Sequence, residues 1–249
     1  PSAKLNVGGA SSFSGGTLSL GSSSNEDYNA RICLRGNVTI TNTPSGAYAP
    51  ITLASGFTTL MTGGQLELSG NLTFIGNESN PDTVTISGKP GEGSPGVFAL
   101  DGSHSFNIGE GAAVVDLAIS IPLIDGASEG GLTKTGAGTL ELQGANTYTG
   151  RTVVTAGNFV FNGSGVSPIN VSGGVLTGSG TISRSVDIGN GGTMSPGCPL
   201  GTMGTGDLNL AGAKAKLCFD ISGSGRNEYD QIHVTGSVKL VGGGEIELV

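Results

Sequence analysis

The hydrophobic residues of this chain occur in short clusters in which apolar and polar positions alternate. Leu140 and Leu142, separated by one glutamate, form one of many such clusters along the sequence. Alternation with a period of two is typical of a β-strand with one buried face. The longest alternating run covers residues 115–123 and predicts one strand. Pro122 lies on the outward side of that run, where a proline is restricted to an edge, an end or a bulge.

Glycine and other turn residues separate the clusters. Of the 249 residues, 47 are glycine, and GG, SG, NG and DG pairs stand between the strand patterns. These residues favour turns and disfavour helices. In the second half, strand-and-turn units recur about every ten residues, so two or three units would form one rung of roughly 20 residues. A compact sandwich or barrel would use the same strands, but the long connections of Greek keys are scarce. We therefore predict an all-β fold, a single elongated β-solenoid of about twelve rungs and, at about 4.8 Å per rung, about 60 Å long.

Composition and charge exclude several classes of protein. Hydrophobic residues make up 36% of the chain, which is too many for a disordered glycine-serine linker. The formal net charge of −8 argues against a nucleic-acid partner, because such binding needs a basic surface. We also expect no membrane span in this chain, since no apolar run reaches about 20 residues. The chain begins with Pro1, so we expect a mature or cut fragment whose signal peptide is not visible.

One segment resembles a known family. From Gly130 the chain reads GGLTKTGAGTLELQGANTYTGRTVVTAGNFVFNG, which is similar to the passenger-associated repeat of bacterial autotransporters. The matching positions are Leu132, Thr133, Lys134, Gly136, Gly138, Leu140, Leu142, Gly144, Asn146, Thr147, Tyr148, Gly150, Thr152 and Gly157. The resemblance covers roughly residues 126–249. Residues 1–125 share only the general pattern of short strands and glycine turns. They carry a polar loop near residues 22–30, and we expect their rungs to continue directly into the second part of the rod.

The resemblance implies a right-handed parallel β-helix that is exported to the outer surface of a Gram-negative-type cell. The residues themselves support this fold independently. We expect Asn146 and Thr147 either to bridge backbone groups at turns or to stack as ladders between rungs, and Tyr148 to pack its ring across a corner with its hydroxyl at the surface. Corner positions, where glycine allows a positive φ and close backbone approach, are expected at Gly131, Gly136, Gly138, Gly144, Gly150 and Gly157.

The three cysteines allow two interpretations. Cys33, Cys198 and Cys218 could all be small buried hydrophobic residues. However, a rung of about 20 residues would place Cys218 next to Cys198, at a separation that permits a disulfide and leaves Cys33 free. Cys198 also stands where the resembling family usually has a small polar residue.

Candidate catalytic and metal-binding groups are few. His104 is expected in a loop, and His233 is expected to point outward between two apolar neighbours. The segment with Asp220, Asn227, Glu228 and Asp230 could hold a calcium ion or form a plain hairpin turn. Sugar-cleaving β-helices use carboxylates from neighbouring rungs, but this chain has no tryptophan and only four tyrosines for stacking on sugars. We therefore predict no catalytic residues and no cofactor.

These observations lead to a leading hypothesis and two alternatives. The first is a non-enzymatic extracellular stalk or adhesin-like passenger that displays loops to a host or neighbouring cell surface. The second is a subunit of an extracellular filament or sheath, in which the chain binds itself through its terminal rungs, because open strand edges template further pairing. The third is a polysaccharide-active β-helix enzyme.

Overall fold

A computed structural model describes residues 4–7, 11–14, 18–20, 31–42, 51–53, 65–88, 96–197, 200–225 and 228–249. Within these ranges the chain forms short strands of two to six residues and no helix. No helix of the described residues is long and apolar enough to cross a membrane. The polar loop predicted near residues 22–30 lies outside the described residues.

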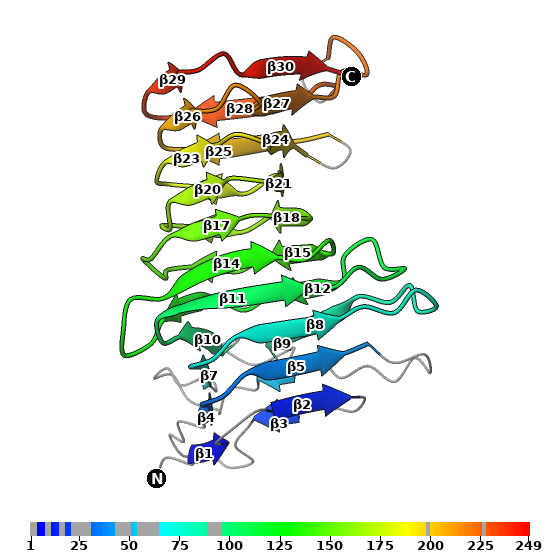
Figure 1. Ribbon diagram of the computed structural model, residues 1–249, viewed down its shortest axis with the longest axis vertical. Helices are drawn as coiled ribbons and strands as arrows, with labels where there is room; N and C mark the ends of the chain where they lie inside the picture. The colour runs from blue at the N-terminus through cyan, green and yellow to red at the C-terminus, as the bar shows by residue number, and fades with distance from the viewer. Residues whose placement is uncertain are drawn as a thin grey trace.

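Successive strands turn through three directions and then pair with the strand one turn earlier, so the chain coils (Figure 1). All pairings between strands are parallel, as Leu117↔Leu140 between β12 and β15 illustrates. Two ten-stranded sheets run along the described chain. Sheet II contains β2 (Ser11–Ser14), β5 (Val38–Thr41), β8 (Leu72–Ile75), β11 (Ser103–Ile108), β14 (Gly131–Thr135), β17 (Thr152–Val154), β20 (Ile169–Val171), β23 (Val186–Ile188), β26 (Leu208–Leu210) and β29 (Val238–Leu240).

Sheet III contains β3 (Leu18–Leu20), β6 (Ile51–Leu53), β9 (Val84–Gly88), β12 (Leu117–Ile119), β15 (Thr139–Leu142), β18 (Asn158–Phe161), β21 (Gly174–Gly178), β24 (Gly192–Pro196), β27 (Lys216–Phe219) and β30 (Glu245–Leu248). The third side of the coil is shared by two five-stranded sheets. Sheet I contains β1 (Lys4–Val7), β4 (Arg31–Leu34), β7 (Gln65–Leu68), β10 (Val97–Leu100) and β13 (Leu123–Asp125). Sheet IV contains β16 (Ala145–Asn146), β19 (Ser164–Gly165), β22 (Thr181–Ile182), β25 (Thr202–Thr205) and β28 (Gln231–Val234).

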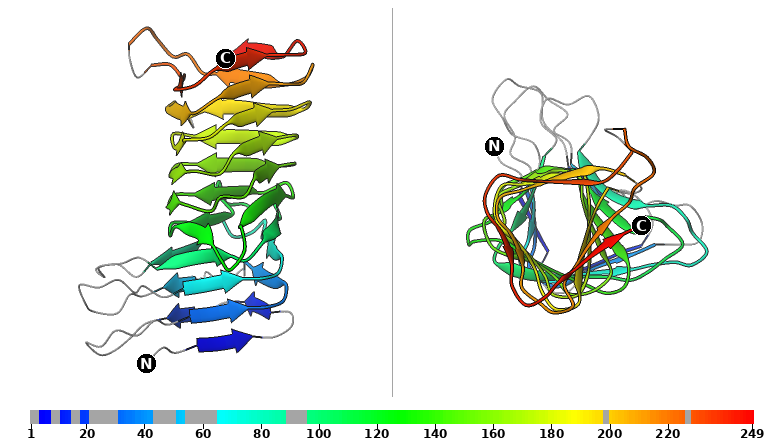
Figure 2. Two further views of the ribbon diagram at one scale, coloured as in Figure 1. Left: turned by 90° about the vertical axis from the view of Figure 1, so that its left-hand side faces the viewer. Right: turned by 90° about the horizontal axis from the view of Figure 1, so that it is seen from above.

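The result is the predicted parallel β-helix, an elongated rod whose rungs enclose one core (Figure 2). Every second residue of a strand points inward and stacks on its partner in the next rung, as Leu140 does on Phe159. Aromatic rings also pack within one rung. Phe98 and Phe106 pack with ring centroids 6.2 Å apart, and Phe159 and Phe161 with centroids 6.1 Å apart. This core gives the rod its stability, because each buried aliphatic or aromatic side chain contributes about 1.5–3 kcal/mol.

The rungs are fewer and less regular than predicted. Sheets II and III each contain ten strands within the described chain, so at about 4.8 Å per strand the coil is about 45 Å long rather than 60 Å. Equivalent corner residues lie 34 positions apart at Asn37 and Asn71, but 17 positions apart at Asn162 and Ser179. The N-terminal rungs therefore carry longer loops than the middle rungs. The last rung is long again, since Leu208 pairs with Val238, so a single period of 20 does not describe the chain.

The single strand predicted over residues 115–123 is wrong. The structure divides this run into β12 and β13, which belong to different sheets. The alternation continues through the corner because Ile121, although it lies between the strands, also points into the core and is fully buried. Pro122 lies at the corner and contributes only its carbonyl, which accepts a hydrogen bond from the Phe98 N–H at 2.8 Å.

Candidate functional site

Two of the predicted corner glycines lie in one column along the rod. Gly136 has a φ of +76° and Gly157 a φ of +65°, in the left-handed region that glycine adopts without a steric penalty. Gly174, with a φ of +72°, continues the column in the next rung. A Cβ at Gly157 would lie only 2.5–2.6 Å from three carbonyl oxygens of the preceding rung. These glycines therefore provide both the turn and the close stacking of successive rungs.

The other predicted corner glycines have a different physical reason. A Cβ on Gly138 would lie 2.5 Å from the Gly109 carbonyl oxygen, and one on Gly144 would lie 2.5 Å from the Ile121 carbonyl oxygen. A Cβ on Gly150 would come similarly close to the Gly130 carbonyl oxygen in the rung below. Gly131 lies in strand β14 rather than at a corner, where a Cβ would collide with the Ser103 side chain. At these positions the small size of glycine matters rather than a positive φ.

Asn146 bridges backbone groups of three neighbouring rungs, as the sequence predicts. Its Oδ1 accepts a hydrogen bond from the Leu123 N–H at 3.0 Å, and its Nδ2 donates to the carbonyls of Gly144 and Ser164 at 2.9 and 3.2 Å. The side chain is only 2% exposed. Asn146 thus satisfies corner backbone groups that would otherwise be buried without partners. Its role is structural.

The prediction that the Tyr148 hydroxyl lies at the surface is wrong. Tyr148 is 1% exposed, and its hydroxyl lies 2.5 Å from the Thr152 Oγ1. That oxygen is 2.9 Å from the Ser167 Oγ, which donates to the Gly150 carbonyl at 2.6 Å. Burial raises the pKa of Tyr148, although the hydrogen bonds to the two hydroxyls oppose this effect. The phenol therefore begins a chain of hydroxyls that ends on the backbone.

Replacing Tyr148 by phenylalanine tests this chain of hydroxyls. The ring would still fill its space, but the Thr152 hydroxyl would lose one of its two partners in a buried site and keep only Ser167. We expect the free energy of unfolding to fall by about 1 kcal/mol, the net contribution of a buried hydrogen bond. Chemical denaturation followed by circular dichroism would measure it, and an unchanged midpoint would contradict the proposed contribution.

Lys134 is fully buried, which is unusual for a charged residue. Its Nζ donates hydrogen bonds to the carbonyls of Thr135 and Gly136, both at 2.9 Å, and of Ala156 at 3.1 Å. Burial lowers the pKa of its amine to about 8, while the nearby Asp116 carboxylate has the opposite effect. Lys134 therefore acts as an internal cap for the glycine corner. The one available signal was the alternation, because Leu132 and Lys134 share the inward parity of their strand.

The acidic group near residue 220 is organised around the backbone. The Asp230 carboxylate accepts hydrogen bonds from the Gly201 and Asp220 N–H groups at 2.8 and 3.0 Å. Glu228 accepts one from the Gly225 N–H at 2.6 Å, and Asn227 lies outside the described residues. In the part of the chain that the structure describes, no three histidine, cysteine, aspartate or glutamate residues form a group that could hold a metal ion. The Ser222 N–H donates to the Glu228 carbonyl and Ile221 forms an antiparallel bridge with Tyr229, which is the pairing of a hairpin, while the calcium site stays a prediction.

The structure describes Cys33 as a buried free thiol and Cys218 as a partly exposed one. Cys198 lies outside the described residues. In the register of β24 and β27, Met194 pairs with Leu217, so Cys218 follows beside Ser195. The Cys218 Sγ lies 3.5 Å from the Glu247 carboxylate, in the direction away from β24. The disulfide between Cys198 and Cys218 therefore stays a prediction that this register does not favour.

The two histidines lie in different parts of the rod. His104 belongs to strand β11 and is 7% exposed, so the prediction of a loop position is wrong. Its Nε2 lies 3.1 Å from the Asp101 carbonyl oxygen, and burial lowers its pKa. His233 is exposed in β28, as predicted. Each histidine has a local structural environment, and the fold does not bring the two together.

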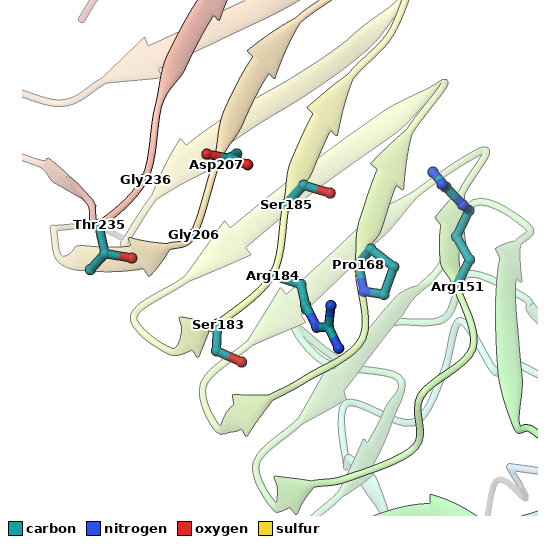
Figure 3. A pocket seen from close by; sticks show the side chains of 9 residues that line it. All are labelled: Arg151, Pro168, Ser183, Arg184, Ser185, Gly206, Asp207, Thr235 and Gly236. Atoms are coloured by element: carbon teal, nitrogen blue, oxygen red, sulfur yellow. The ribbon is translucent and has the colours of Figure 1, made fainter.

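A polar groove lies along one corner of the C-terminal rungs, where the chain passes from sheet IV to sheet II (Figure 3). Its volume is about 540 Å³, within the range of about 300–1,000 Å³ that small-molecule sites occupy. The strand register stacks one outward position from each rung along this corner. The lining residues are Arg151, Pro168, Ser183, Arg184, Ser185, Gly206, Asp207, Thr235 and Gly236.

The two ends of this corner groove differ in charge. Arg151 lies at one end, 53% exposed, with its guanidinium 3.5 Å from the Asp187 carboxylate. Arg184 is also exposed, and the described residues provide it with no ion pair. Asp207 lies further along the same corner, where hydrogen bonds from the Ser237 N–H and hydroxyl lower its pKa. The groove is therefore cationic at one end and anionic at the other.

A second hollow of about 380 Å³ adjoins the corner groove on the face of sheet IV. It forms because Gly204, which pairs with Thr181 below and His233 above, has no side chain. Ser183 and Thr235 line both hollows. Together they make one extended surface, of which the corner groove is the more polar part and the hollow on sheet IV the more apolar part. This surface could not be predicted from the sequence, because its residues come from several rungs.

Comparison with known proteins confirms the resemblance to autotransporter passengers. Residues 132–160 match the family model described as the Passenger-associated-transport-repeat. The chain is 42% identical over 80 residues to an extracellular serine protease of Serratia marcescens. It is 33% identical over 101 residues to the adhesin BmaC autotransporter of Brucella suis biovar 1. It is 32% identical over 153 residues to the autotransporter lipoprotein NalP of Neisseria meningitidis serogroup B.

These similarities cover 32%, 39% and 59% of this chain, but only 8%, 3% and 12% of the respective relatives. The chain therefore spans a small share of the length of the relatives it matches. The names of these relatives describe extracellular and autotransporter proteins, which agrees with the predicted extracellular location at the outer cell surface. The relatives include both proteases and an adhesin, so their activities differ.

Proposed function

We propose that this chain, which carries a passenger-associated-transport repeat, is a non-enzymatic segment of an autotransporter passenger that serves as a stalk and displays binding surfaces outside the cell. The observation that carries the proposal is the position of the matched repeat. Residues 132–160 run from β14 to β18, which is one full turn of the coil and part of the next, and their strands pair with the rungs on both sides. The repeat is thus a part of the rod itself and contributes to its length and rigidity.

The repeat residues support a structural function. Gly157, Asn146, Tyr148 and Lys134 all stack rungs or satisfy buried backbone groups. The environments of the two histidines also support a non-enzymatic role, since His104 binds a backbone carbonyl and His233 lies in a distant rung. A nucleophilic triad needs a histidine between a nucleophile and a carboxylate.

Surface labelling of cells that express the full-length gene tests this proposal. Antibodies raised against residues 126–249 are expected to label intact cells, and protease added outside is expected to remove the label. Deletion of the gene is expected to reduce attachment to host cells or to neighbouring cells. Labelling that appears only after permeabilisation would contradict the proposed location. Incubation of the purified chain with casein and with acidic glycans is expected to release no products, and released products would contradict the non-enzymatic role.

A second candidate function is a subunit of an extracellular filament, in which the rod would bind another copy of the chain through its terminal rungs. Val238, Leu240 and Ile246 are 55–65% exposed, whereas their partners in the preceding rung are at most 5% exposed. This open apolar face would be covered by a further rung or by another copy of the chain. Light scattering over a range of concentrations would distinguish the two: a filament subunit grows with concentration, and Leu240→Lys blocks that growth, whereas a stalk segment stays monomeric.

A further inference from the structure

We propose that the corner groove, together with the adjoining hollow on sheet IV, binds an acidic oligosaccharide. The acidic group of the ligand would lie against Arg151 and Arg184, and its sugar hydroxyls would bind Ser183, Ser185 and Thr235. This inference rests on the proposed surface role, because it names the ligand class that a displayed groove would recognise.

The cationic end of the groove is built to receive an anion. Arg184 is exposed, and no carboxylate within the described residues neutralises it. Arg151 keeps its contact with Asp187 at 3.5 Å, which fixes its position while leaving half of its side chain exposed. Guanidinium groups bind carboxylate and sulfate oxygens through two parallel hydrogen bonds. The rungs of the two arginines are two strand spacings apart, or about 10 Å along the rod.

The remainder of the groove fits a sugar better than a peptide or a nucleic acid. Serine and threonine hydroxyls both donate and accept hydrogen bonds, which matches the hydroxyls of a sugar ring. In Figure 3 the Pro168 ring lies between the two arginines and offers a small apolar surface. The net charge of −8 disfavours a polyanion such as nucleic acid, which would contact much more than this corner.

Asp207 gives the bound ligand a direction. Its carboxylate is held by two hydrogen bonds from Ser237 at 2.6 and 2.9 Å, and these hydrogen bonds favour its ionised form. The Asp207 carboxylate therefore repels an acidic group of the ligand at its own end of the groove. Within this groove, the arginine end is the only favourable place for that acidic group. The adjoining hollow beside Gly204 provides room for further sugar units.

Titration calorimetry of the purified full chain at low and moderate salt tests the inference. The ligands are tetragalacturonate, a sulfated heparin-derived tetrasaccharide and uncharged cellotetraose. We expect one or both acidic tetrasaccharides to bind and cellotetraose not to bind, and the two acidic ligands distinguish carboxylate from sulfate recognition. Equal binding of cellotetraose, or no binding of either acidic ligand, would overturn the proposal. So would complete competition by equimolar inorganic sulfate, which would show a simple anion site.

Matched variants locate the binding. Arg184→Gln removes an exposed charge without disturbing the core, and we expect the dissociation constant to rise about tenfold or more. Arg35→Gln removes an exposed arginine far from the groove and is expected to leave binding unchanged. Asp207→Asn keeps an acceptor for Ser237 and is expected to tighten binding, a gain that misfolding could not produce. Equal effects of Arg184→Gln and Arg35→Gln, or weaker binding by Asp207→Asn, would contradict the proposed site. These binding measurements use purified protein, so they do not depend on whether the chain is exported. Their outcome is therefore independent of the outcome of the surface-labelling experiment.

Discussion

Replacing Lys134 by methionine is expected to lower the free energy of unfolding by about 3 kcal/mol, because buried carbonyl groups would be left without a hydrogen-bond donor. Methionine would keep the volume of the side chain. However, the carbonyls of Thr135, Gly136 and Ala156 would lose their common donor. Chemical denaturation of both proteins, with circular dichroism at strand wavelengths, measures the difference.

The matched control for this variant is Lys214→Met. Lys214 is exposed, and the Lys214 hydrogen bond that involves Asn190 uses the backbone N–H, so its substitution is expected to change stability by less than about 0.5 kcal/mol. Equal effects of the two substitutions would show that Lys134 has no special role in the corner.

Lys134 should also make stability depend on pH in the basic range. Burial lowers the pKa of its amine to about 8 in the folded protein, whereas an exposed lysine titrates near about 10.4. Between these values the unfolded chain binds the proton more tightly, so the contribution of Lys134 to the free energy of unfolding rises with increasing pH. The difference between the original chain and Lys134→Met isolates this contribution from other titrating groups. A difference that does not vary from pH 8 to pH 10 would contradict it.

Gly157→Ala is expected to cost about 4 kcal/mol. Part of this cost, about 1–2 kcal/mol, comes from placing a residue with a Cβ at a φ of +65°. The remainder comes from the collision of that Cβ with the carbonyls of Gly136, Ala137 and Gly138, since overpacking costs about 1–3 kcal/mol. Thermal unfolding measures the loss in the free energy of unfolding. A loss below about 1 kcal/mol would contradict the prediction, because it would mean that neighbouring rungs move apart and make room for the Cβ at little cost.

Two other glycines separate these contributions. Gly102 has a φ of +99°, but no atom lies within 4 Å of the place that a Cβ would take, so Gly102→Ala reports the backbone cost alone. Gly150 meets the Gly130 carbonyl without a positive φ, so Gly150→Ala reports the collision alone. The two smaller losses are expected to sum approximately to the loss in Gly157→Ala.

The fold class could be predicted from the sequence because strand alternation and glycine turns are local signals. The rung length could not be predicted from the sequence, because the strands show the same alternation whatever the length of the loops between them. Residues 115–123 show the same limit: Ile121 continues the alternation through a corner because the core lies on the inner side of every sheet. In a coil, a period of two reports which side chains point inward and not where a strand ends.

Individual residues of the candidate site were harder to predict. Asn146 takes the first of its two expected roles, because an amide at a turn satisfies neighbouring backbone groups in most settings. Tyr148 and Lys134 are polar residues whose partners come from other segments, Ser167 and Ala156, so burial could not be inferred locally. The corner groove has the same origin, since Arg151 and Arg184 become neighbours only through the strand register.

The variable spacing between equivalent corners has a consequence for how such a protein diversifies. Each strand takes its register only from the strands above and below it, as Leu132↔Thr152 and Thr152↔Ile169 show for rungs of unequal length. Residues inserted at a corner therefore need not shift the pairing of any other rung. The outer surface can acquire new recognition segments while the interior stays constant, which separates the evolution of specificity from the maintenance of the fold.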